Sequence, residues 1–257
     1  MDKQNSQITV TFDSNVWESI VDPAKRVNNP TYEAIFNTIT SSNIRPFFFE
    51  GVATIEIVPK ANRIDHFPNS RPRITMKIGD NPTRVIEGTA APKLSDYLSA
   101  NLPLALDLGF RFIRLPRIGL PIVPEEFWAK DEFFTLEDRL ERSFNFSQHI
   151  ESLGMGRAKM DHKTRDILEY RAMGTRLADK KILPRAYAKA VAEWADGDAL
   201  AAHYGYGINY FCTNDRGRSA GTESVFSASN LNELVQRFSL KIVDPDELIV
   251  VMHNTKR

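Results

Sequence analysis

The stretch ITVTFDSNV, residues 8–16, decides the fold class. Its first five residues, 8–12, alternate with a period of two, which predicts a β-strand. The strand runs directly into Asp13, and we expect a helix to begin there with Ser14 or Asn15 as its cap. A strand that passes at once into a helix is typical of α/β proteins.

The same succession of strand and helix signals recurs along the chain. Further strands are expected at 47–49, 208–212 and 240–243. Further helices are expected at 30–42, 51–58 and 161–178, from Pro184 onward, and at 230–238. This order predicts a three-layer α/β fold, in which helices flank a central, mainly parallel sheet.

Between residues 60 and 154 the pattern loosens, because prolines break it into short pieces. We expect a small hairpin at 73–78 and 84–87, and helices at 94–108 and 136–153. We interpret 60–154 as an insertion or subdomain, with the core formed by 6–58 and 161–250.

Composition excludes several classes of protein. Among 257 residues, 33 Lys and Arg balance 33 Asp and Glu, so any affinity for nucleic acid must come from local patches. Cys212 is the single cysteine, which leaves no disulfide framework and no thiolate zinc site. The first residues lack a secretory signal and no apolar run is long enough to span a bilayer, so we expect a cytoplasmic protein without a membrane partner.

Acidic residues follow several of the expected strands. Asp13 ends the first strand and Asp215 follows the strand at 208–212, while Asp198 lies in the segment leading into that strand. Glu56 lies in the helix after the second strand. Carboxylates that converge at one edge of a sheet raise each other's pKa values. A hard divalent cation, Mg²⁺ or Mn²⁺, holds such groups ionised and serves phosphodiester hydrolysis.

Each acidic residue also has a structural alternative. Asp13 and Asp198 could each be a helix cap, the latter because Gly197 would interrupt the helix. Glu56 could be a solvated helical residue, and Asp215 could simply begin a polar loop. Only their joint placement at strand ends favours a site.

Three stretches resemble PIN-domain nucleases. VTFDSNV at 10–16 is similar to the family's opening strand, which ends in Asp-x-Asn or Asp-x-Ser. The stretch 198–215 resembles the third and fourth acidic positions with the strand between them. The stretch 240–248 looks like the closing strand and its proline-containing exit. The resemblance covers roughly 6–58 and 161–250, and leaves 60–154 unmatched.

The resemblance implies a PIN-like fold and an acidic site. The site that it implies consists of Asp13, Glu56, Asp198 and Asp215 as catalytic residues, with Asn15 and Thr213 as supporting polar residues. Of these, Asp13, Asp198 and Asp215 fall on metal-binding positions. Two alternatives stay open: Glu50 competes with Glu56, and Asp196 competes with Asp198, although the following Ala-Leu-Ala-Ala favours Asp198.

The function implied is that of an endoribonuclease that depends on Mg²⁺ or Mn²⁺, as in a toxin or a phage-defence effector. RNA is the expected substrate, and a regulatory protein such as an antitoxin, or a second copy in a homodimer, is compatible with this class. The alternative is a catalytically inert PIN-like module that binds RNA or protein. A haloacid-dehalogenase-like phosphatase fits less well, since it needs a second Asp where this chain has Asn15.

Two groups of basic residues are candidates for RNA contact. The first consists of Arg157, Lys159, His162, Lys163 and Arg165, and the second of Arg111, Arg114 and Arg117 beside Phe110 and Phe112. Lysine and arginine contact phosphates, and aromatic rings stack on bases. The alternative is that both groups are solvated surface charge.

Overall fold

The centre of the molecule is a five-stranded sheet in the order β5-β2-β1-β6-β7, in which every neighbouring pair is parallel. Its strands are β1 (Ile8–Phe12), β2 (Ile44–Phe49), β5 (Arg111–Ile113), β6 (Tyr210–Cys212) and β7 (Ile242–Val243). A second, antiparallel sheet pairs β3 (Arg73–Lys77) with β4 (Thr83–Glu87). This computed structural model describes residues 7–67, 73–77, 83–87, 94–115, 124–172, 182–215 and 224–255.

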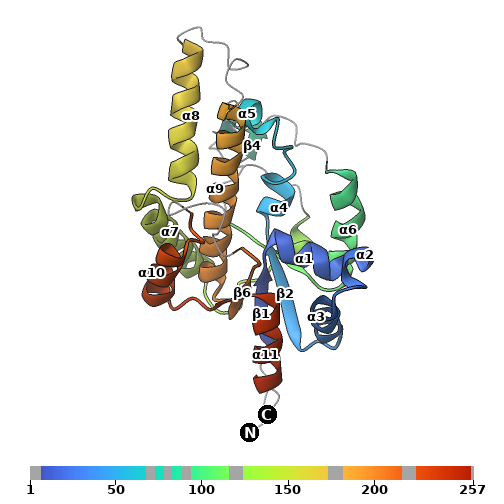
Figure 1. The fold of residues 1–257 in the computed structure, drawn as a ribbon. Coiled ribbons are helices and arrows are strands. Elements are labelled where there is room, and N and C mark those ends of the chain that lie inside the picture. The colour runs from blue at the N-terminus through green and yellow to red at the C-terminus, as the bar shows by residue number, and fades with distance from the viewer. Residues whose placement is uncertain are drawn as a thin grey trace.

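Helices cover both faces of the central sheet, so the α/β fold expected from the sequence is confirmed (Figure 1). On one face lie α1 (Ser14–Val21), α3 (Pro30–Thr40), α6 (Asp96–Asp107) and α11 (Pro245–Thr255). On the other lie α7 (Leu136–Ser152), α9 (Ile182–Tyr206) and α10 (Ala228–Phe238). The remaining helices are α2 (Pro23–Arg26), α4 (Gly51–Thr54), α5 (Arg63–His66), α8 (Arg157–Ala172) and a 3₁₀ turn at Glu125–Phe127.

The three phenylalanines of β2 join the sheet to the helices on both of its faces. Successive side chains of a strand point to opposite faces. Phe48 therefore packs with α1, α3 and α6, whereas Phe47 and Phe49 pack with α7 and α9. All three are almost fully buried, so β2 is apolar on both sides, as is usual for a strand inside a parallel sheet.

Most expected elements are present with shifted ends. The first helix is capped by Asp13 itself, whose side chain accepts from the Ser14 backbone N–H, and not by Ser14 or Asn15. The helix expected at 51–58 ends at Thr54. The helix expected at 161–178 begins earlier, at Arg157; residues 173–178 lie outside the described part of the chain.

Part of the region expected to be an insertion belongs to the core. β5 lies within it and pairs with β2, through Phe47 opposite Arg111 and Phe49 opposite Ile113. α6 and α7 also come from this region, and they pack on opposite faces of the sheet. The segments 94–115 and 136–152 are therefore structural parts of the α/β fold.

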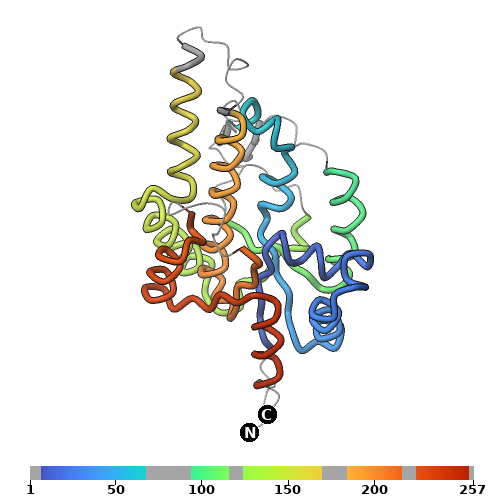
Figure 2. Tube along the Cα trace, in the orientation of Figure 1, coloured from blue at the N-terminus to red at the C-terminus, as the bar shows by residue number. Residues whose placement is uncertain are grey.

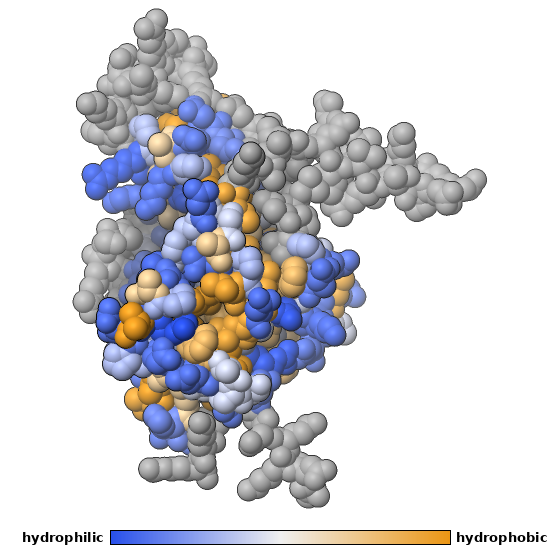
Figure 3. Space-filling view, turned by 90° about the vertical axis from the view of Figure 1, so that its right-hand side faces the viewer, coloured by the Kyte–Doolittle hydropathy of each residue, from blue (hydrophilic) through white to orange (hydrophobic). Residues whose placement is uncertain are grey.

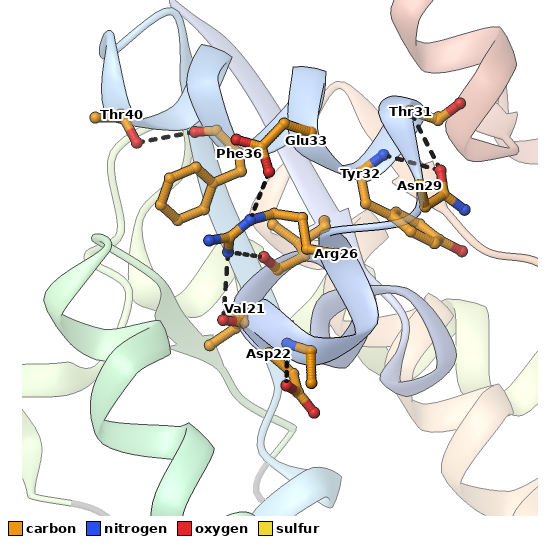
Figure 4. Close-up of polar contacts among 11 residues, drawn as sticks. Val21, Asp22, Arg26, Asn29, Thr31, Tyr32, Glu33, Phe36 and Thr40 are labelled. Carbon is orange, nitrogen blue, oxygen red and sulfur yellow. Dashed lines mark hydrogen bonds and ion pairs between the residues drawn. The ribbon is translucent and has the colours of Figure 1, made fainter.

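Arg26 fastens the helices of the α1 face to one another (Figure 4). Its Nη1 donates to the carbonyl oxygen of Ile20 at the end of α1, 2.7 Å away, and its Nε donates to Glu33 of α3 at 2.9 Å. The guanidinium lies 3.7 Å from the centre of the Phe36 ring. One side chain thus supplies a donor to an open helix end and packs on the next helix.

We expect Arg26→Met to lower the free energy of unfolding by about 1–3 kcal/mol, because a backbone carbonyl and a carboxylate each lose their donor. Urea denaturation measures the loss. Lys25→Met is the matched control, since Lys25 makes an exposed ion pair with Glu18 and such pairs contribute little. Equal losses in the two variants would show that Arg26 is not the fastening residue.

The face that carries α2, α3 and α6 is seen in Figure 3, where hydrophobic residues gather in the middle of a largely hydrophilic surface. Val27, after α2, and Leu104, on α6, are among the exposed apolar residues.

In the described part of the chain no helix is both long enough and apolar enough to cross a membrane.

Candidate active site

The order of the strands marks one point on the sheet where a ligand site is expected. From β1 the chain proceeds to β2 and β5 on one side, and it then returns to place β6 and β7 on the other side. In open parallel sheets, ligands bind beyond the carboxyl ends of the strands where the order reverses in this way. Here that point lies between β1 and β6, with α1, α4 and α9 around it (Figure 1).

Asp13, directly after β1, is held at this point by hydrogen bonds, of which three are short. Its carboxylate accepts from the Ser14 backbone N–H at 2.7 Å, from Asn15 Nδ2 at 2.7 Å and from Thr213 Oγ1 at 2.6 Å. Thr213 follows β6, so its hydroxyl joins the ends of the two strands. The structure therefore brings Asn15 and Thr213 to Asp13, as the sequence led us to expect.

Four carboxylates act on one another at this edge of the sheet. Burial raises the pKa of Asp13, and the charge of Asp215 raises it further. Burial likewise raises the pKa of Glu56 to about 7, with the charge of Asp13 as the next cause. The pKa of Asp196 is raised well above its ordinary value by burial and then by Asp13, Glu193, Glu56 and Asp215. We call Asp13, Glu56, Asp196 and Asp215 the acidic group.

Asp196, and not Asp198, is the α9 residue of the acidic group. α9 runs unbroken from Ile182 to Tyr206, so Gly197 does not interrupt it and Asp198 is no cap. Residues two apart on a helix point about 200° apart. Asp198 is accordingly fully buried on another side of α9, where it accepts from Trp194 Nε1 at 2.9 Å.

Glu50 also lies outside the acidic group. Its Oε1 accepts from the Leu115 backbone N–H at 2.9 Å, and its Oε2 lies 3.7 Å from Arg114 Nε. Burial raises the pKa of Glu50 to about 7, while the positive charge of Arg114 lowers it. The charge of Asp198 also raises the pKa of Glu50. Of the two competing glutamates, Glu56 is therefore the one beside Asp13.

The acidic group does not form a coordination shell for a metal ion in this conformation. Carboxylate oxygens are the donors that Mg²⁺ and Mn²⁺ prefer. Within the described ranges, however, no three His, Cys, Asp or Glu side chains are arranged so that they could hold a metal ion. Both oxygens of Asp13 already accept hydrogen bonds in this conformation.

Three residues around the acidic group were not predicted from the sequence as site residues. Ser14 hydrogen-bonds to Glu56 and lowers its pKa. Arg63, almost fully buried, lowers the pKa of Glu56 by its charge and donates to the carbonyl oxygens of Val58 and Ala188. Glu193, one turn before Asp196, accepts from a backbone N–H. A buried arginine carries no local sequence signal, because its burial depends on α5 meeting α9.

The basic residues of α8 lie on a helix beside α9, and both helices extend beyond the carboxyl edge of the sheet (Figure 2). Arg157 lies 3.5 Å from Asp161, and Lys163 lies 3.1 Å from Asp166, so each has an acidic neighbour on its own helix. His162 also faces Asp166, and Arg165 is exposed. The positive charge of Lys159 lowers the pKa of Glu193, which lies one turn before Asp196 on α9.

The second basic group is engaged inside the fold, and its expected stacking role is wrong. Phe110 and Phe112 have no exposed surface, so neither ring is open to a base. Arg111 Nη1 donates to the carbonyl oxygens of Leu106 and Phe110. Arg114 lies over the Trp128 ring at 3.5 Å. Arg117 is outside the described residues.

Comparison of the chain with protein-family models, with curated proteins and with solved structures finds no match. The resemblance to PIN-domain nucleases therefore rests on the three stretches quoted above. Function has to be argued from the acidic group and from its place in the sheet.

Proposed function

We propose that this protein is a divalent-metal-dependent endoribonuclease with a PIN-like core, which hydrolyses RNA phosphodiester bonds at the acidic group. The observation that carries the proposal is the placement of four carboxylates where the strand order reverses, where the charges of Asp13 and Asp215 raise the pKa of neighbouring acidic residues. Buried carboxylates that repel one another destabilise the folded chain unless a proton or a cation neutralises them, and such an arrangement is typical of a functional site.

The side chains have distinct tasks in this proposal. Asp13, Asp196 and Asp215 would hold Mg²⁺ or Mn²⁺ once their side chains turn from the arrangement described above, and the cation would activate water and stabilise charge on the attacked phosphate. Thr213 and Asn15 orient the Asp13 carboxylate through hydrogen bonds. Glu56, whose pKa is raised to about 7, is suited to accept a proton from the attacking water near neutral pH.

RNA would approach along α8. Arg157, Lys159, Lys163 and Arg165 project from this helix beside α9, and phosphate contacts with them supply affinity without regard to sequence. Lys159 acts electrostatically on Glu193, one turn from Asp196, so it is the cation best placed for the strand that enters the site. A role as a toxin or phage-defence effector follows from the resemblance alone.

The test is cleavage of labelled single-stranded and structured RNA in Mn²⁺, in Mg²⁺ and in chelator. We expect cleavage in either metal and none in chelator. Cleavage that persists in chelator would overturn the metal mechanism. Tight RNA binding without cleavage in either metal would favour the alternative, an inert PIN-like RNA-binding module.

Metal should also stabilise the fold, since it binds the native carboxylates and not the unfolded chain. We expect millimolar Mn²⁺ to raise the Tm by about 5 °C or more, which corresponds to about 2 kcal/mol for a chain of this size. Asp215→Asn should lose most of this gain, because one ligand is removed. A Tm that Mn²⁺ leaves unchanged in the unaltered protein counts against the site.

A further inference from the structure

A chain of hydrogen bonds leads from the acidic group to a neighbouring part of the surface. Asn15 Nδ2 donates to Asp13, and Asn15 Oδ1 accepts from the Asn214 backbone N–H at 3.1 Å. Asn214 Nδ2 in turn donates to the Tyr32 hydroxyl at 2.9 Å and approaches the Asn15 carbonyl oxygen at 3.4 Å. We call Asn15, Asn214 and Tyr32 the polar ledge.

The polar ledge is exposed but rigidly held. Asn15 and Asn214 are both exposed, one in the first turn of α1 and the other directly after Thr213. Tyr32 lies in the first turn of α3, where it is labelled in Figure 4, and its half-buried ring packs against the hydrophobic core. Exposed amides are usually free to rotate in water, whereas these are tied to α1, α3 and β6.

The fixed orientation leaves two hydrogen-bonding groups of the polar ledge without a partner among the described residues. The Asn214 amide nitrogen donates to the Tyr32 hydroxyl and to the Asn15 carbonyl oxygen. None of the described residues donates to its oxygen Oδ1. The Tyr32 hydroxyl accepts from Asn214, which leaves its own hydrogen to donate. An exposed acceptor in a fixed place takes a hydrogen-bond donor from a ligand, and an exocyclic amino group is one such donor.

We propose that the polar ledge is a nucleobase subsite beside the scissile phosphate, which favours a base with an exocyclic amino group through Asn214 Oδ1. The inference rests on the proposed nuclease function, because the acidic group supplies the reason for RNA to lie here. Cytosine and uracil are the sharpest pair of bases, since cytosine presents an amino donor where uracil presents a carbonyl oxygen.

The experiment measures the dissociation constants of labelled oligo(C) and oligo(U) of equal length by fluorescence anisotropy, with chelator present. We expect oligo(C) to bind about fivefold more tightly, the usual worth of one hydrogen bond. Asn214→Ala should bring the two constants within about twofold, and Tyr32→Phe should weaken the preference because the amide loses its anchor. Tyr97→Phe, which removes a hydroxyl bonded to Asp22 elsewhere, is the matched control and should keep the preference.

Equal affinity of the unaltered protein for the two oligonucleotides, or no binding of either, would overturn the subsite. A preference that survives Asn214→Ala would overturn it as well. Because chelator is present, the result does not depend on cleavage. If the protein prefers oligo(C) yet cleaves no RNA in Mn²⁺, the proposed nuclease activity is refuted and the nucleobase subsite is supported.

Discussion

Asp196→Asn should lower the kcat/KM for RNA cleavage by about 1000-fold or more, whereas Asp198→Asn should keep it within about fivefold. In the proposed mechanism the first change removes a charged ligand from the acidic group, and both metal binding and stabilisation of the charged transition state depend on that charge. The second changes a residue that is buried on another side of α9, where asparagine still offers an oxygen to Trp194 Nε1. Initial rates in Mn²⁺ decide between them.

Comparing the two substitutions separates an effect on catalysis from an effect on the stability of the fold. Both substitutions lie on α9, two residues apart, and both exchange a carboxylate for an amide of equal shape. Thermal melts in chelator control for stability, and there Asp196→Asn should melt no lower than the unaltered protein, because one repelling charge is gone. If cleavage is lost in Asp198→Asn but not in Asp196→Asn, Asp198 would be the metal ligand, as the sequence favoured.

The choice between Asp196 and Asp198 depends on helix packing that the sequence does not show. Asp13, Asn15, Thr213 and Asp215 could be placed without coordinates, because strand ends are read from short apolar stretches and parallel strands end at one edge. Asp196 and Asp198 lie inside a helix, where a shift of one residue turns a side chain by 100°. Gly197 suggested an interruption, and only the packing of α9 shows that the helix continues.

The sheet edge at β5 was missed for a related reason. β5 has three residues and begins at Arg111, so its period-two signal is too short to detect. Phe110 and Phe112 were interpreted as surface rings because arginines flank them, yet pairing with β2 buries both. Burial of a short strand is a property of the partner strand, and local sequence does not encode it.

Glu56→Gln should make the metal-free protein more stable at pH 8 by about 3 kcal/mol and leave its stability at pH 4 nearly unchanged. The folded-state pKa of Glu56 is raised from 4.5 to about 7, so below pH 4.5 the carboxyl is protonated in both states and costs nothing. As the pH rises through 7, the folded chain must carry a charge on Glu56 that burial and Asp13 oppose. The rise in pKa from 4.5 to about 7 corresponds to a loss of about 3 kcal/mol in the free energy of unfolding.

Urea denaturation in chelator at pH 4, 6 and 8 measures this pH dependence, with Glu137→Gln on the exposed first turn of α7 as the control. The control should follow the unaltered protein at every pH. Saturating Mn²⁺ should then shrink the advantage of Glu56→Gln, because a bound cation offsets the repulsion that the amide relieves. If Glu56→Gln raised the free energy of unfolding equally at pH 4 and pH 8, the gain would come from better packing of glutamine. The charge of Asp13 would then not act on Glu56.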